Sequence, residues 1–271
     1  MIVDEAKCTG CLECIPYCPM VAIEERMNLV TIDLDECVEC GVCFRAGVCA
    51  VEALVPQELT WPRTLRAEFS DPSAPYMSPV FARRAQIVSG TEMDRRTLLS
   101  RTGEAIVISG RGTLEMKTND VSGRYRHGRA GIAVEMGRPG VGTRFHDVQK
   151  VARALAPLGV NFEERNPLTD LMTDKSSGTF RDDILDEKVL SCIVEFDLPL
   201  QMVTPVLERL KEVAKDIDTV FAVDLISIVE KDGSIPTIDA ARRADVEVSI
   251  NGKTNVGLGR PLADVFNEES R

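Results

Sequence analysis

Two short stretches near the N-terminus decide the fold of that region: Cys8-Thr-Gly-Cys11-Leu-Glu-Cys14-Ile-Pro-Tyr-Cys18-Pro19 and Cys37-Val-Glu-Cys40-Gly-Val-Cys43, the second followed by Cys49. Two-residue gaps between cysteines let one tight loop aim three thiolates at a common centre. Each stretch also has a later cysteine, Cys18 or Cys49, that can serve as a fourth ligand. Eight of the nine cysteines of the chain fall in this segment. The spacing therefore predicts two metal centres with four cysteines each.

The sequence around the two stretches is repeated as well. Val3-Asp4 precedes the first stretch as Ile32-Asp33 precedes the second, and Ala22-Ile23 follows Cys18 as Ala53-Leu54 follows Cys49. A duplicated half-module explains both repeats. We expect the two halves to be related by a pseudo-twofold axis.

This pattern resembles the bacterial two-cluster ferredoxin family, in which the fourth cysteine of one stretch binds the cluster of the other. The resemblance implies two [4Fe–4S] clusters with the following ligands: Cys8, Cys11, Cys14 and Cys49 for cluster I, and Cys37, Cys40, Cys43 and Cys18 for cluster II. The second stretch departs from the family pattern, because five residues separate Cys43 from Cys49 and Ala50 replaces the expected proline. We expect the extra residues, within 44–48, to form a small bulge beside one cluster.

Other uses of the cysteines remain open at this stage. Zinc sites also use paired Cys-X-X-Cys motifs, although triple runs followed by Cys-Pro favour cubane clusters. A disulfide framework is disfavoured because it belongs to secreted chains, and no secretory leader is seen here. Cys192 lies in the apolar stretch Val189-Leu-Ser-Cys-Ile-Val and is expected to be a small buried hydrophobe.

Composition narrows the classes of partner. The formal net charge is −11, which disfavours nucleic acid and anionic membrane surfaces. Aromatic residues make up only 5% of the chain, so an aromatic platform for nucleic-acid bases is not expected. No apolar run approaches the roughly 18 residues that cross a bilayer. We expect a cytoplasmic protein with no membrane span.

The composition also divides the chain into three parts: a two-cluster module at residues 1–56, an arm or linker at 57–103, and an α+β domain at 104–271. Five prolines lie between Pro56 and Pro79, and arginine is frequent up to Arg101, so regular structure is not expected in the arm.

In the third part the order β-α-β-β-α-β predicts a ferredoxin-like α+β sandwich with helices on one face of the sheet. The strands are expected at residues 130–136, 159–164, 188–197 and 219–229, and the helices at 145–157 and 204–216, with Thr204 as N-cap of the second helix. Flanking hairpins are expected at 104–118 and 246–256, the latter turning at Asn251-Gly252. This domain carries no family-specific motif, so its fold does not give its function.

The loop Gly137-Arg-Pro-Gly-Val-Gly-Thr-Arg144 is the one chemically suggestive piece of this domain. Free amides at a helix N-terminus beside two arginines suit a carboxylate or a phosphate. The candidate anion site therefore consists of Arg138, Gly140, Gly142, Thr143 and Arg144. An unliganded turn is the competing interpretation.

The leading hypothesis is an electron-transfer subunit that passes low-potential electrons to a catalytic partner. Two alternatives stay open: an enzyme with its substrate at the 137–144 loop, and a redox-responsive regulator. The C-terminal domain is also a candidate surface for homo-oligomer formation. Neither histidine, His127 nor His146, lies beside a recognisable nucleophile in the sequence, so no catalytic residue is predicted.

Overall fold

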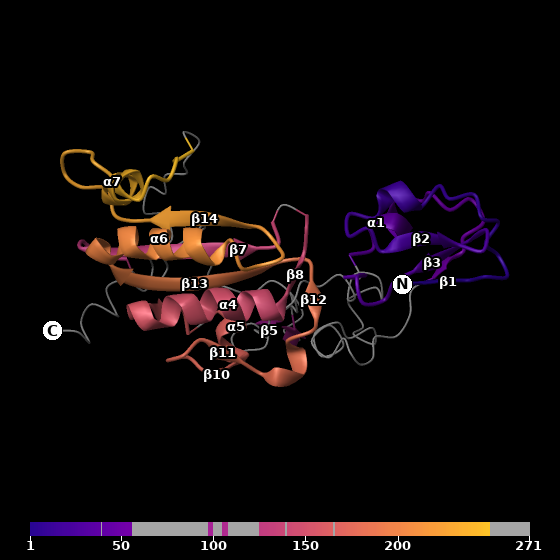
Figure 1. Cartoon of the computed structure of the whole chain (residues 1–271), viewed down its shortest axis with the longest axis horizontal. Helices are drawn as coiled ribbons and strands as arrows, with labels where there is room; N and C mark the ends of the chain where they lie inside the picture. Colours follow the sequence, from indigo (N-terminus) through magenta and orange to yellow (C-terminus); the bar gives the residue numbers. More distant parts are fainter. Residues whose placement is uncertain are drawn as a thin grey trace.

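The computed structural model describes residues 1–38, 40–55, 97–99, 105–107, 125–138, 140–164 and 166–249. We call residues 1–55 the N-terminal module and residues 125–249 the C-terminal domain. Figure 1 shows the module, in indigo, beside the end of the domain where β8 (Thr143–Arg144) and β12 (Lys188–Val189) lie.

The N-terminal module is built from short elements around its cysteines: β1 (Ile2–Val3), η1 (Ile15–Tyr17), β2 (Ile23–Arg26), β3 (Leu29–Ile32), α1 (Val42–Arg45) and β4 (Leu54–Val55). Strand β1 pairs with β4, and β3 pairs with β2, both antiparallel. In the first pair Val3 lies opposite Leu54, and in the second Ile32 lies opposite Ile23. Since the sequence repeat equates Val3 with Ile32 and Leu54 with Ile23, the two pairs are equivalent to each other, as expected for two halves related by a pseudo-twofold axis.

The C-terminal domain contains one main sheet and helices packed on it. Its elements, apart from β8 and β12, are β7 (Arg129–Met136), α4 (Phe145–Leu155), η2 (Ala156–Leu158), β9 (Asn161–Phe162), α5 (Pro167–Asp170), β10 (Met172–Asp174), β11 (Thr179–Phe180), η3 (Asp182–Ile184), β13 (Cys192–Pro199), η4 (Leu200–Met202), α6 (Val203–Val213), β14 (Phe221–Ile226) and α7 (Pro236–Arg243). The sheet has the strand order β14-β7-β13-β9, and all its pairs are antiparallel. Mixed helices and small sheets confirm the α+β class.

One face of this sheet and two helices make the main hydrophobic core. Alternate β7 residues, such as Ile132 and Val134, face Phe196 and Val194 across the ladder and pack with α4 and α6. Helix α4 presents apolar side chains at helical spacing, from Val148 to Leu155, and all of them are buried. Burying such a stripe stabilises a helix that would be marginal alone in water.

The other face of the sheet carries buried carboxylates beside a small apolar cluster of Tyr125, Ala133, Ile193 and Ile226. Glu135 on β7 and Glu195 on β13 are 7% and 3% exposed. Arg138 Nη1 donates to Glu135 at 2.9 Å, and Asn166 Nδ2 donates to Glu195 at 2.8 Å. Carboxylates this deep persist because charged or amide donors satisfy them.

Two boundary predictions in the domain are wrong. The strand expected at 188–197 is broken, because β12 pairs with β8 and the chain joins the main sheet only at β13. Thr204 is not the N-cap of α6, which starts at Val203 after the turn η4. The Thr204 hydroxyl instead donates to the carbonyl of Ala240, at 3.0 Å. Proline is tolerated in the first turn because amides there have no partner within the helix.

Several smaller elements differ from expectation or lie outside the described residues. Two elements were not predicted: the β10–β11 hairpin, which turns after Asp174, and helix α7. The described partner of β6 (Ala105–Val107) is β5 (Thr97–Leu99), whereas the predicted partner at 113–118 lies outside the described residues. Residues 246–249 are irregular rather than a strand, and the rest of that predicted hairpin is also outside.

Candidate metal centre

The loops that carry the cysteines depend on backbone conformations that glycine provides. Gly10 and Gly41 have φ of 68° and 66°. A Cβ on Gly10 would lie 2.1 Å from the carbonyl oxygen of Asn28, so no other residue fits there without moving the β2–β3 turn. The close approach holds the first cysteine loop against β2 and β3.

The first group of thiols gathers around Cys14, which is buried. Burial is the largest cause that raises the pKa of Cys14, and the neighbouring charges of Cys11, Cys49 and Cys8 raise it further. Four cysteines from the two stretches therefore lie close enough to repel one another as thiolates. Cys11 is the exposed member of this group. We call Cys8, Cys11, Cys14 and Cys49 the first cysteine set.

A second cysteine set consists of Cys18, Cys37, Cys40 and Cys43. Burial raises the pKa of Cys43 to about 12, and the charges of Cys37, Cys40 and Cys18 raise it as well. All four line a small, largely apolar pocket, walled also by Met20, Ala22, Ile23 and Val38. A thiol whose pKa is raised in this way is protonated at neutral pH unless a positive group lies beside it, and bound metal supplies that group by stabilising the deprotonated sulfur.

In each set, one sulfur accepts a hydrogen bond from a backbone amide. The two amides belong to residues that the sequence repeat equates. The N–H of Ala22 donates to Cys18 Sγ at 3.2 Å, and the N–H of Ala53 donates to Cys49 Sγ at 3.1 Å. Hydrogen bonds to ligand sulfur tune the potential of a cluster. The repeat noticed in the sequence at these two alanines therefore has a chemical role.

The longer gap in the second stretch forms a helical turn. Helix α1 starts at Val42, includes Cys43 and Phe44, and is followed by Gly47 with φ of 64°. The corresponding part of the first stretch is the shorter turn η1. The predicted bulge is therefore the turn that carries the chain from Cys43 to Cys49.

In the predicted anion loop, other groups of the protein already contact the two arginines and the amides at the start of α4. Arg138 contacts Glu135, and the amides of Phe145 and His146 donate to the carbonyls of Glu187 and Leu185. The Thr143 hydroxyl donates to the carbonyl of Arg144, and Gly140 faces open space. The loop is also closed on itself, since the amide of Gly142 donates to the carbonyl of Gly137 at 3.1 Å.

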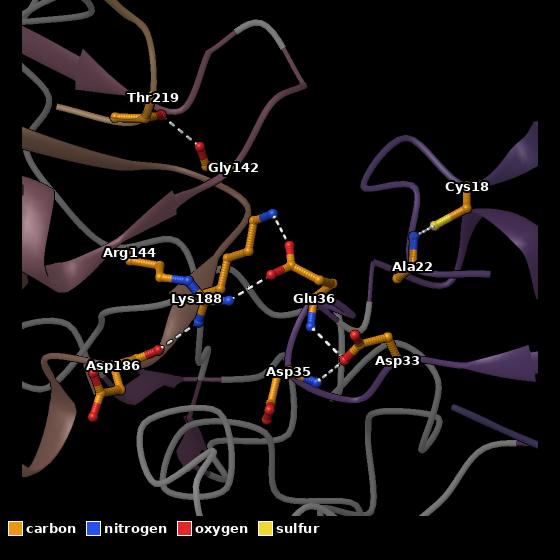
Figure 2. Close-up of polar contacts among 10 residues, drawn as sticks. All are labelled: Cys18, Ala22, Asp33, Asp35, Glu36, Gly142, Arg144, Asp186, Lys188 and Thr219. Atoms are coloured by element: carbon orange, nitrogen blue, oxygen red, sulfur yellow. Dashed lines mark hydrogen bonds and ion pairs between the residues drawn. The ribbon is translucent and has the colours of Figure 1, made fainter. Parts of the chain in front are cut away.

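Glu36 contacts this loop from the N-terminal module, and no feature of the sequence predicted this contact. Arg144 Nη2 donates to Glu36 Oε1 and Lys188 Nζ donates to Glu36 Oε2, each at 2.5 Å. Figure 2 shows the carboxylate between the two cations. The hydrogen bond from Lys188 is the largest cause that lowers the pKa of Glu36; burial raises it, and the charges of Lys188 and Arg144 lower it further. No local pattern marks a glutamate as the partner of residues more than a hundred positions away.

Cys192 is buried, as predicted, and burial raises the pKa of its thiol to about 12. Among the residues described, the cysteines of each set are neighbours, but no three histidine, cysteine or acidic side chains lie close enough together to hold a single metal ion. In the same part of the chain, every helix is too short or too polar to cross a membrane.

Comparisons with known proteins assign the N-terminal module. Residues 1–49 match the family model of the 4Fe-4S dicluster domain. The chain is 39% identical over 57 residues to Ferredoxin-1 of Caulobacter vibrioides, which covers 20% of this chain and 48% of that protein. It is 38% identical over 42 residues to the delta subunit of NADH-dependent phenylglyoxylate dehydrogenase of Aromatoleum evansii, which covers 16% of this chain and 45% of that subunit. The chain thus spans about half the length of these curated relatives. No solved structure matches it significantly.

The resemblance of the module to two-cluster ferredoxins is therefore confirmed. The N-terminal module is an iron–sulfur electron-transfer domain. The family model ends at residue 49, and the C-terminal domain has no assigned family.

Proposed function

We propose that the chain is an electron-transfer subunit that holds two [4Fe–4S] clusters and passes electrons to a catalytic partner. One observation carries the proposal: the charge of Cys49 acts on Cys14 and the charge of Cys18 acts on Cys43, so a later cysteine of each stretch lies near the other stretch. Chains with cysteines crossed in this way keep two clusters within one small module. The delta subunit matched in Aromatoleum evansii belongs, by its name, to a dehydrogenase, which supports a partner of that kind.

In this proposal the first cysteine set holds cluster I and the second holds cluster II. Each cluster stores and releases single electrons when bound. The chain supplies the surroundings: the apolar walls of the pocket limit water, and the amides of Ala22 and Ala53 stabilise negative charge on sulfur. The pseudo-twofold relation places both sets in one core, with Cys14 of the first set packed among Ile23, Val30 and Leu54.

The partner that we propose carries a basic docking surface. The module is acidic, since residues 1–55 contain ten acids and three bases, a net charge of −7 before any cluster is counted. Complementary charge speeds the encounter of electron carriers with their partners.

For the C-terminal domain, the strand order β14-β7-β13-β9 supports a β-α-β-β-α-β sandwich. Because Arg138 and Arg144 contact Glu135 and Glu36, we propose no external ligand at the 137–144 loop.

Anaerobic reconstitution followed by iron and sulfide counting tests this proposal. We expect about eight iron and eight sulfide per chain, and two reducible centres in a redox titration followed by EPR. Cys49→Ala and Cys18→Ala should each disturb one centre and leave the other, whereas Cys192→Ala, the matched control, should keep full iron content. A chain with no reducible centre, or equal loss in the Cys192→Ala variant, would overturn the proposal.

A further inference from the structure

The described contacts between the N-terminal module and the C-terminal domain lie around the second cysteine set, and the pairing of β8 with β12 explains one of them. Arg144 and Lys188 lie directly opposite each other in this antiparallel pair. Like charges in such a position are destabilising unless an anion lies between them. The Glu36 carboxylate provides that anion, with one oxygen for each cation. We call these three residues the Glu36 clamp.

Each member of the clamp is held in place by its own side of the interface. Asp33 Oδ1 accepts from the amides of Asp35 and Glu36, at 2.8 and 3.3 Å, and so fixes the turn that presents Glu36. Arg144 also donates to the carbonyl of Asp186 at 2.7 Å. Figure 2 shows these contacts around the carboxylate. Lys188 is the least exposed of the three, with 15% of its side chain accessible. Charge-assisted bonds between fixed, partly buried groups are stronger than those between free surface charges.

Apolar contacts lie beside the clamp and reach the second cysteine set. Leu190 of the C-terminal domain packs in one cluster with Met20, Ala22 and Val38 of the module, and Cys18, Cys37 and Cys40 pack against the same cluster. Gly142 allows this approach, because a Cβ at that position would lie 2.8 Å from Met20 Sδ. The C-terminal domain therefore covers the side of the module that holds the second set.

The two halves of the module differ at the position that docks. Glu36 precedes Cys37, and its counterpart before Cys8 in the duplicated half is Lys7. Lys7 pairs within the module, with Asp4 at 3.8 Å. A lysine cannot enter a site formed by Arg144 and Lys188, because like charges repel. The difference between Glu36 and Lys7 thus selects which of the two cysteine loops faces Arg144 and Lys188.

We propose that the C-terminal domain is a built-in docking partner, held by the Glu36 clamp, that covers one side of the second cysteine set, whose four cysteines stay partly exposed, and leaves the first set, with its exposed Cys11, to face external partners. The docking surface itself rests only on the contacts given above between the module and the C-terminal domain, and not on a bound cluster. The assignment of cluster II to the covered side rests on the proposed function.

Hydrogen exchange measured by mass spectrometry on the full reconstituted chain tests the clamp. Glu36→Gln and Lys188→Gln should each speed exchange in peptides covering Gly142 and Lys188 by roughly three- to tenfold, because each removes one charge from the ion pairs. The double variant should show little more than the larger single effect, since both substitutions break the same interaction. Lys7→Gln, the matched control in the other half, should leave exchange unchanged. Additive effects, or an equal response to Lys7→Gln, would overturn the clamp.

A pair of glycine variants gives a second test that leaves all charges in place. Gly142→Ala and Gly140→Ala both put alanine at positive φ, 77° and 67°, but only the first would push against Met20. Gly142→Ala should therefore speed exchange in module peptides covering Met20 and Val38, and Gly140→Ala should not. Equal effects of the two variants would contradict a close interface at this point.

Release of iron to a chelator tests the covering of the second set. The wild-type chain should lose iron in a fast and a slow phase, and Glu36→Gln should speed the slow phase by roughly three- to tenfold, like the exchange rate. A single phase in the wild type would overturn the covering. If the chain binds no iron, the proposed function fails, but the exchange experiment still decides whether the clamp exists.

Discussion

Two residues with positive φ turn the chain so that an amide reaches a cysteine sulfur. Val21 and Glu52 have φ of 55° and 52°, and each directly precedes the alanine whose N–H donates to Cys18 or Cys49. For a β-branched residue such as Val21 this conformation is strained. The strain lies beside the two cysteines whose sulfurs accept these bonds, as is common where backbone geometry serves a site.

Val21→Gly should therefore stabilise the module. Glycine adopts the same φ without strain, and the Val21 side chain is 82% exposed, so little buried area is lost. We expect a gain of about 1 kcal/mol after the entropy cost of glycine. Val51→Gly is the control, because Val51 has no positive φ and is less exposed, and it should lower stability. The midpoint of guanidinium-induced loss of the cluster absorbance measures both, and a lower midpoint for Val21→Gly would contradict strain at this residue.

The contacts predictable at this scale are those that depend on local spacing. Three cysteines separated by two-residue gaps must lie on one loop, and the family resemblance predicts the fourth member of each set. Glu36 could not be found in this way. Its partners Arg144 and Lys188 are distant in sequence. They reach Glu36 only because of the way the N-terminal module and the C-terminal domain meet.

At the scale of elements, Asn166 joins the short helix α5 to the face of the sheet that carries the buried carboxylates. Its Oδ1 accepts from the amide of Leu168 at 2.8 Å, which caps the helix. Its Nδ2 donates to the carbonyl of Ile193 at 3.1 Å and to the buried Glu195 at 2.8 Å. One side chain thus satisfies groups on two elements that meet away from solvent.

Asn166→Ala should lower the free energy of unfolding by about 2–3 kcal/mol, because it removes a cap and two bonds to buried acceptors, one of them a carboxylate. Asn161→Ala removes an exposed bond to Asp197 and should cost no more than about 0.5 kcal/mol. Guanidinium unfolding followed by circular dichroism compares the two variants. Equal costs would show that burial of the Asn166 network contributes nothing.

Which segments of the C-terminal domain form helices and strands was largely predictable from the sequence, whereas the residues at which they begin and end were not. Helix α4 was predictable because its apolar residues recur at helical spacing around one buried face. Thr204-Pro205 looked like a helix start, yet α6 begins earlier because η4 already leads the chain into the helix. The break between β12 and β13 had no local signal, since it arises where Leu190 leaves the sheet to pack on the N-terminal module.

At the scale of the whole molecule, the Glu36 clamp makes docking of the two parts dependent on pH. The hydrogen bond from Lys188 and the nearby cations lower the pKa of Glu36 against the opposing effect of burial. A carboxylate whose pKa is lowered by docking stabilises the docked state fully above its ordinary pKa of 4.5, and the stabilisation is lost as pH falls through the lowered value. Docking should therefore be complete at neutral pH and weaken below about pH 4.5.

Small-angle X-ray scattering of the full chain, with cluster absorbance recorded at each pH, measures this change. The wild type should expand between pH 7 and pH 4 as Glu36 gains a proton. Glu36→Gln should already be somewhat more expanded than the wild type at pH 7 and change less on acidification, because glutamine has no charge to lose. Lys7→Gln keeps the clamp and should follow the wild type. Other carboxylates also titrate in this range, so the difference between wild type and Glu36→Gln is the quantity that decides. If both chains expand equally with falling pH, groups other than the clamp hold the two parts together.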